Sequence, residues 1–79
     1  MSDRLFVRVR RDARWGRVCW REELVTPTEH GRTVTELGWS PFANAAVGSA
    51  LRAAERRGVG VRIPKALRGC PAYVHWGRS

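Results

Sequence analysis

The segment SPFANAAVGSALRAAERRG, residues 40–58, is the clearest structural element of the chain and decides the fold class. Ser40 is a good N-cap, and Pro41 suits the first helical position, where its missing N–H costs nothing. Gly58 stands where a left-handed C-cap is expected, after Arg56 and Arg57, whose charges complement the carbonyl end of the helix dipole. One apolar stripe recurs at helical spacing between these caps: Ala43, Ala46, Val47, Ala50, Leu51 and Ala54. The segment predicts a helix whose small side chains let it lie close against a sheet.

The sequence before this helix has the period of β-strands. Residues 5–11 and 17–24 alternate apolar and polar side chains, as half-buried strands do, and residues 32–39 are also β-prone. Residues 12–16 supply a turn, and residues 26–31 form a loop by their turn chemistry. The side chains expected beneath the helix are Leu5, Val7, Val9, Val18, Trp20 and Leu24.

After the helix, residues 59–63 predict a fourth strand, residues 65–69 one helical turn, and residues 72–76 a fifth strand. The prediction is therefore one α+β domain over residues 1–79, with the order β-β-β-α-β-β and an antiparallel sheet that has one helix packed on one face. Because the helix stripe is mostly alanine, Trp15, Trp20 and Trp39 are expected to fill the core before they serve in binding.

The charge of the chain is strongly unbalanced. The 79 residues include fifteen Lys and Arg and seven Asp and Glu, which gives a net charge of +8. Lys65 is the single lysine, so the other fourteen cationic residues are arginines. The planar guanidinium binds phosphate and carboxylate through two parallel hydrogen bonds and stacks on bases. This composition predicts an acidic or polyanionic partner.

Strand alternation predicts where this charge acts. If the helix covers the face of Val7 and Val9, then Arg8, Arg10, Arg17 and Arg21 emerge together on the other face, with Cys19 among them. Such guanidiniums suit phosphate contacts, and an exposed aromatic ring among them suits base stacking. The candidate binding residues are Phe6, Arg8, Arg10, Arg11, Arg14, Arg17 and Arg21, with a secondary basic cluster at Arg52, Arg56 and Arg57. An uncovered sheet face carries polar side chains in any case, so a merely solvated surface stays open as the alternative.

Other chemistry finds no support in the sequence. Cys19, Cys70, His30 and His75 lack the paired spacing of zinc ligands, so no metal or other cofactor is expected. No phosphate-binding glycine loop, triad order or carboxylate pair points to an enzyme. No apolar stretch is long enough to span a membrane, and the N-terminus lacks a signal-peptide pattern. We therefore expect a cytoplasmic protein with reduced cysteines, although a single bridge between the two stays open.

The stretches VRRDARWGRVCWRE and GRTVTELGW, followed by an alanine-rich helix that ends in RAAERRG, resemble a known DNA-binding plan. Ethylene-response-factor domains, and the N-terminal arm-binding domains of some tyrosine integrases, combine a three-stranded sheet with such a helix. The resemblance implies that the sheet enters the major groove. It assigns base and phosphate contacts to Arg8, Arg10, Arg17 and Arg21, with Trp15 and Trp20 beside them, and it does not cover residues 59–79.

The layout, strands flanking one alanine-rich helix in a very short chain, also resembles small anti-CRISPR proteins of phages and mobile elements, among them inhibitors of type I effectors. Many of those inhibitors are acidic DNA mimics, and this chain departs from them in its charge. This resemblance implies an inhibitor that acts in the cytoplasm of a bacterial host cell and contacts guide RNA, target DNA or an acidic protein surface.

Three functions follow, all of them non-enzymatic. The first is a protein that binds a nucleoprotein complex, in its sharpest form an anti-CRISPR inhibitor of a type I effector. The second is a sequence-reading DNA-binding protein of the integrase or excisionase kind, and the third a ribosome-associated structural protein. The expected partner is nucleic acid, a nucleoprotein complex such as a CRISPR effector, or an acidic protein surface, bound by a monomer or a weak homodimer.

Overall fold

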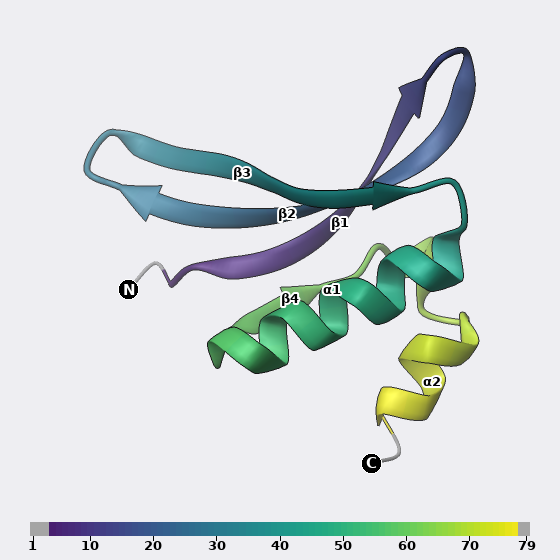
Figure 1. Cartoon of the computed structure of the whole chain (residues 1–79). Coiled ribbons are helices and arrows are strands. Elements are labelled where there is room, and N and C mark those ends of the chain that lie inside the picture. The colour runs from purple at the N-terminus through teal and green to yellow at the C-terminus, as the bar shows by residue number, and fades with distance from the viewer. Residues whose placement is uncertain (1–3, 78–79) are drawn as a thin grey trace.

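The computed structural model describes residues 4–77, so both ends of the predicted 1–79 domain lie outside it. Strands β1 (Phe6–Arg14), β2 (Arg17–Thr28) and β3 (Gly31–Ser40) precede helix α1 (Ala43–Arg57). Strand β4 (Gly60–Arg62), the 3-10 turn η1 (Lys65–Leu67) and helix α2 (Pro71–Gly77) follow it (Figure 1). The α+β class and the predicted order of the first five elements are confirmed.

The sheet is mixed, with the strand order β3-β2-β1-β4. Strands β1, β2 and β3 pair antiparallel, as predicted, but β4 pairs parallel to β1, so the prediction of a wholly antiparallel sheet is wrong. A parallel neighbour needs a long crossover connection, and α1 provides it between β3 and β4. Because β4 pairs with β1 and not with β3, the chain returns across the whole meander before it adds its last strand.

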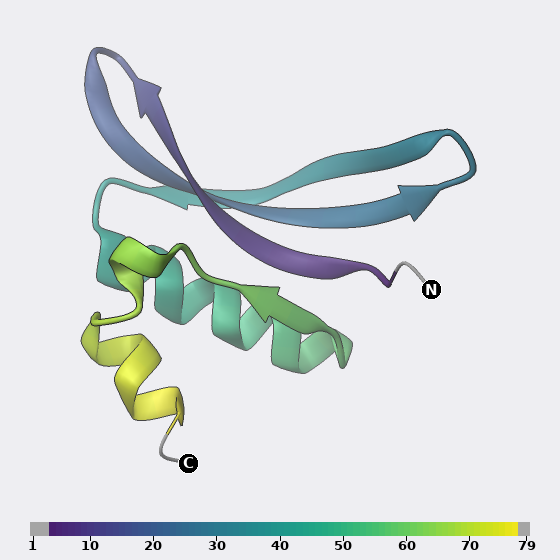
Figure 2. The same cartoon turned by 180° about the vertical axis from the view of Figure 1, so that it is seen from behind.

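Both hairpin connections are two-residue turns. Arg14 pairs with Arg17 across Trp15–Gly16, and Thr28 pairs with Gly31 across residues 29–30. The strands therefore run further than predicted. The expected turn at 12–16 is reduced to residues 15–16, and the expected loop at 26–31 to residues 29–30. The two turns lie at opposite ends of the twisted sheet (Figures 1 and 2).

Helix α1 starts later than predicted and ends where predicted. Phe42 is its N-cap residue, and the Ser40 hydroxyl accepts a hydrogen bond from the Phe42 N–H at 3.1 Å outside the helix. Ser40 remains in β3 because it pairs with Trp20, so it cannot cap the helix as predicted. At the other end Gly58 adopts φ +65°, the left-handed C-cap that its position predicted.

The segment 71–77 forms helix α2, not the predicted fifth strand. Its apolar alternation is short, and Pro71 begins a helix as readily as it borders a strand. The Ala72 N–H donates to Asn44 Oδ1 of α1 at 2.8 Å, a contact between residues far apart in the sequence. Figure 2 shows α2 near the end where α1 begins. A tertiary hydrogen bond therefore supports a helix that local pattern did not reveal.

The buried core joins β1 to α1. Val7 and Val9 of β1 form one cluster with helix side chains and with residues after the helix: Ala46, Val47, Ala50, Leu51, Ala54, Ile63 and Leu67. Trp20 packs against this cluster only partly buried, whereas Trp15 is 84% exposed and Trp39 is 39% exposed. The prediction that tryptophans fill the core is therefore wrong for Trp15 and Trp39, because one occupies a turn and the other pairs with Arg21, on the side of the sheet away from the core.

Candidate functional site

The strand register brings most of the predicted binding residues onto one face of the sheet. Arg8, Arg10 and Arg14 of β1 lie opposite Glu23, Arg21 and Arg17 of β2, and paired residues share a face. Since Val7 and Val9 alternate with them and belong to the core, these arginines lie on the side away from it. We call this side the arginine face; it includes Phe6, Arg8, Arg10, Asp12, Arg14, Arg17, Cys19, Arg21, Glu23, Val25, Val34, Glu36, Trp39 and Arg62.

Arg11 does not belong to this face. It pairs with Trp20 and alternates with Arg10, so its side chain starts from the same side of the sheet as Val9. Its exposure shows that it reaches solvent at the part of the hairpin beyond the core. The structure therefore separates Arg11 from the other predicted binding residues.

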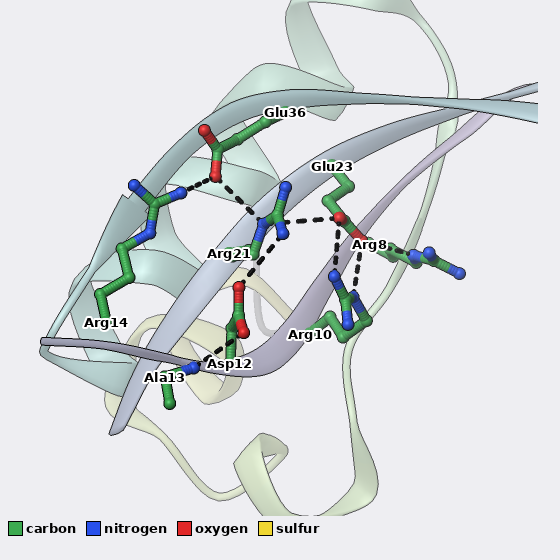
Figure 3. Close-up of polar contacts among 8 residues, drawn as sticks. All are labelled: Arg8, Arg10, Asp12, Ala13, Arg14, Arg21, Glu23 and Glu36. Carbon is green, nitrogen blue, oxygen red and sulfur yellow. Dashed lines mark hydrogen bonds and ion pairs between the residues drawn. The ribbon is translucent and has the colours of Figure 1, made fainter. Parts of the chain in front are cut away.

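Glu23 is the centre of the arginine face and is only 1% exposed. Arg8 Nε donates to Glu23 Oε1 at 2.9 Å (Figure 3). Arg10 donates two hydrogen bonds to the same carboxylate, from Nε to Oε1 at 3.1 Å and from Nη2 to Oε2 at 3.3 Å. A buried carboxylate is costly unless it is paired and hydrogen-bonded, and here the two guanidiniums satisfy it.

The ionisation of Glu23 follows from these contacts. Burial raises the pKa of its carboxyl, but hydrogen bonds and charge attraction from Arg10 and Arg8 outweigh burial and hold the pKa below its ordinary value. The same hydrogen bond, with the negative charge of Glu23, raises the pKa of Arg10. Glu23 therefore stays charged at neutral pH and orients the guanidiniums around it.

A second network extends toward the β1–β2 turn. Arg21 Nη1 donates to Asp12 Oδ2 at 3.1 Å, and Arg21 Nε, which is buried, lies 3.0 Å from Glu36 Oε1 without hydrogen-bond geometry. Arg14 contacts the same oxygen of Glu36 (Figure 3). The hydrogen bond from the Ala13 N–H lowers the pKa of Asp12, burial raises it, and the contact with Arg21 lowers it again. The pKa of Asp12 therefore lies below its ordinary value. The carboxylates link β1, β2 and β3 across the face.

The arginine face is consequently less cationic than its arginines suggest. Asp12, Glu23 and Glu36 compensate part of its charge. Within residues 4–77, the side chains of Arg17 and Arg62 have no carboxylate partner. Arg62 lies over the Phe6 ring, 4.1 Å from its centroid, so the predicted exposed aromatic is half-buried beneath a cation. Cys19, expected to be exposed on this face, is buried at 2% exposure.

An aromatic pocket lies beside the arginine face at the β1–β2 turn. The rings of Trp15 and Trp39 meet edge to face with centroids 5.5 Å apart, and the Arg14 guanidinium lies 5.1 Å from the Trp39 centroid. They enclose a hollow of about 200 Å³ lined also by Arg17, Val18, Cys19 and Pro41. Sequence reasoning missed this pocket because it assigned Trp15 and Trp39 to the core.

The secondary basic cluster lies apart from the arginine face. Arg52, Arg56 and Arg57 are exposed on α1, and Arg57 Nη1 donates to the Ala53 carbonyl at 3.2 Å. This contact is typical of cations that stabilise a helix C-terminus. Arg57 therefore supports the C-terminal end of α1.

Among the described residues, no group of three His, Cys, Asp or Glu side chains is placed to hold a metal ion. Cys19 and Cys70 are free thiols. No helix within residues 4–77 is long and apolar enough to cross a membrane.

Comparison of the chain with protein-family models, with curated proteins and with solved structures finds no match.

Proposed function

We propose that this chain is a non-enzymatic binding protein that engages nucleic acid, alone or within a nucleoprotein complex, through its arginine face. The observation that supports this most is the anchoring of Arg8 and Arg10 on the buried carboxylate of Glu23. A binding surface whose long side chains are already fixed loses less conformational entropy when the partner arrives.

The anchored guanidiniums keep donors for a partner. Each guanidinium has five N–H groups, and Glu23 accepts one from Arg8 and two from Arg10. The Arg8 side chain is 27% exposed and that of Arg10 is 47% exposed, so their remaining N–H groups reach solvent. Phosphate oxygens are natural acceptors for such groups, since arginine binds them in bidentate geometry.

Arg17 and Arg62 complete the face at its two ends. Arg17 stands at the β1–β2 turn, and Arg62 lies on β4 opposite Arg8. Without a carboxylate partner among the described residues, each contributes a full positive charge. Together with the net charge of +8, they favour a polyanion over a neutral partner.

The decisive first experiment is binding of the full chain to a short labelled duplex DNA across a series of salt concentrations. If the face neutralises several phosphates, the logarithm of affinity falls linearly with the logarithm of salt, with a slope of about −0.9 for each contact. An affinity that does not change with salt contradicts phosphate binding. Absence of duplex binding, together with a stable complex with a purified type I CRISPR effector, selects the inhibitor over the DNA-binding protein.

A further inference from the structure

We propose that the pocket between Trp15 and Trp39 accepts one unstacked nucleobase of a nucleic acid bound along the arginine face. This inference rests on the proposed function and adds to it a preference for an unpaired base.

The backbone of Trp15 is unusual for so large a residue. Trp15 has φ +52° and Gly16 has φ +73°, the positive pair of a type I′ hairpin turn. This conformation suits Asn, Asp and Gly, and a bulky side chain adopts it only at a cost in free energy. Strained backbone of this kind gathers at functional sites.

Packing of the Trp15 side chain does not offset the free-energy cost of its backbone conformation. Trp15 is 84% exposed, so its ring contributes little to the core, and its one ring contact is the edge-to-face pair with Trp39. Neither turn preference nor burial therefore explains why position 15 is a tryptophan, and binding of a ligand by its ring explains it better.

The pocket combines the two chemical features that a nucleotide requires. Its apolar walls are Trp15, Val18, Trp39 and Pro41, and the two indole rings offer aromatic surface for stacking. Arg14 and Arg17 border it, and Arg17 has no carboxylate partner within residues 4–77, so its guanidinium is available to the phosphate next to the bound base. An apolar peptide would match the walls but not this cation.

The geometry also selects an unpaired base. Trp15 and Trp39 lie at an interplanar angle of 72° and line a hollow of about 200 Å³, so a ring that stacks on one lies nearly perpendicular to the other. A base that remains paired and stacked in a duplex has both of its faces covered by neighbours. A bulged or single-stranded base leaves a face free for stacking on aromatic side chains.

The test compares a fully paired duplex with the same duplex carrying one unpaired central nucleotide, each titrated into the full chain. Base stacking on an aromatic side chain corresponds to about a 5- to 150-fold gain in affinity, so we expect the bulged duplex to bind more tightly by a factor in that range. In Trp15→Asn this preference disappears while binding of the paired duplex persists. Asn is favoured in the turn, so the variant keeps its hairpin.

Phe42→Ser is the matched control, because Phe42 is also an exposed aromatic, at 70%, and does not line the pocket. It should retain the preference for the bulged duplex, and Trp39→Leu should lose it. Equal binding of the two duplexes by the native chain, or an unchanged preference in Trp15→Asn, would overturn the inference and leave the proposed function standing. Binding of neither duplex would overturn the inference, and it would overturn the proposed function as well if the chain also forms no complex with the purified effector.

Discussion

At the scale of single residues, Glu23 gives the arginine face its order. Alternation predicted which arginines share this face, because the two-residue period is fixed by the pleat. It could not predict that Glu23 lies among them as a buried anchor, since that depends on the pairing of Arg8 with Glu23 and of Arg10 with Arg21. Nor did it predict the burial of Cys19, which is 2% exposed.

Replacing Glu23 by Gln should destabilise the fold. The amide is nearly the same size, but it removes the charge that holds Arg8 and Arg10. Loss of a charged hydrogen-bond partner at a buried position costs about 1–3 kcal/mol. Urea denaturation at neutral pH measures this, and Glu29→Gln, at an exposed turn residue, is the control that should leave the free energy of unfolding unchanged.

The same carboxylate predicts how stability depends on pH. Because the pKa of folded Glu23 lies below its ordinary value of 4.5, its contribution is complete above that value and is lost as pH falls through the lower pKa of the folded state. Stability should therefore fall as pH is lowered through the acidic range, and Glu23→Gln should show a shallower fall. Parallel curves for the two proteins would show that Glu23 is not linked to protonation.

At the scale of elements, hydrophobic period identified α1 and the meander but misassigned the last segment. Residues 71–77 alternate like a strand, yet the Asn44 side chain accepts the hydrogen bond of the Ala72 N–H at the start of α2. The parallel pairing of β4 was equally hidden, because no local signal shows whether a strand joins the meander at β3 or at β1. The conformation of the last segment and the pairing partner of β4 both depend on contacts between segments that are distant in the sequence.

Asn44→Ala should loosen α2 while leaving the arginine face intact. The substitution removes the acceptor of the Ala72 N–H, and loss of a capping side chain costs about 1 kcal/mol. Hydrogen exchange should speed up first at the amides of residues 72–74. Asn44 is exposed, so Asn44→Asp, which keeps an acceptor oxygen, should restore protection; if it does not, the hydrogen bond is not what holds α2.

At the scale of the whole molecule, two groups of cationic side chains lie on different parts of the fold. The arginine face lies on the sheet side opposite the core and is ordered by carboxylates, whereas Arg52, Arg56 and Arg57 follow the exposed side of α1. Composition predicted a basic protein and alternation predicted its basic face. The compensation of that face by Asp12, Glu23 and Glu36 required the register of three strands.

This compensation determines which arginines can be changed without damage. Removing Arg8, Arg10 and Arg21 together would leave Glu23 buried without its partners, so a loss of binding could reflect unfolding. Arg17 and Arg62 have no carboxylate partner among the described residues, and their reversal tests the face with the network in place. The matched pair on the helix is Arg52 and Arg56, which changes the net charge by the same amount.

The most direct measurement is therefore the salt dependence of duplex binding for Arg17→Glu/Arg62→Glu and for Arg52→Glu/Arg56→Glu, after thermal denaturation has shown that both are folded. We predict that the sheet pair weakens binding by about tenfold or more and makes the salt slope shallower by about 2, because each lost phosphate contact lowers the slope by about 1. The helix pair should retain most of the affinity. Equal losses in the two variants would show that binding follows net charge alone, and would contradict the arginine face as the binding surface.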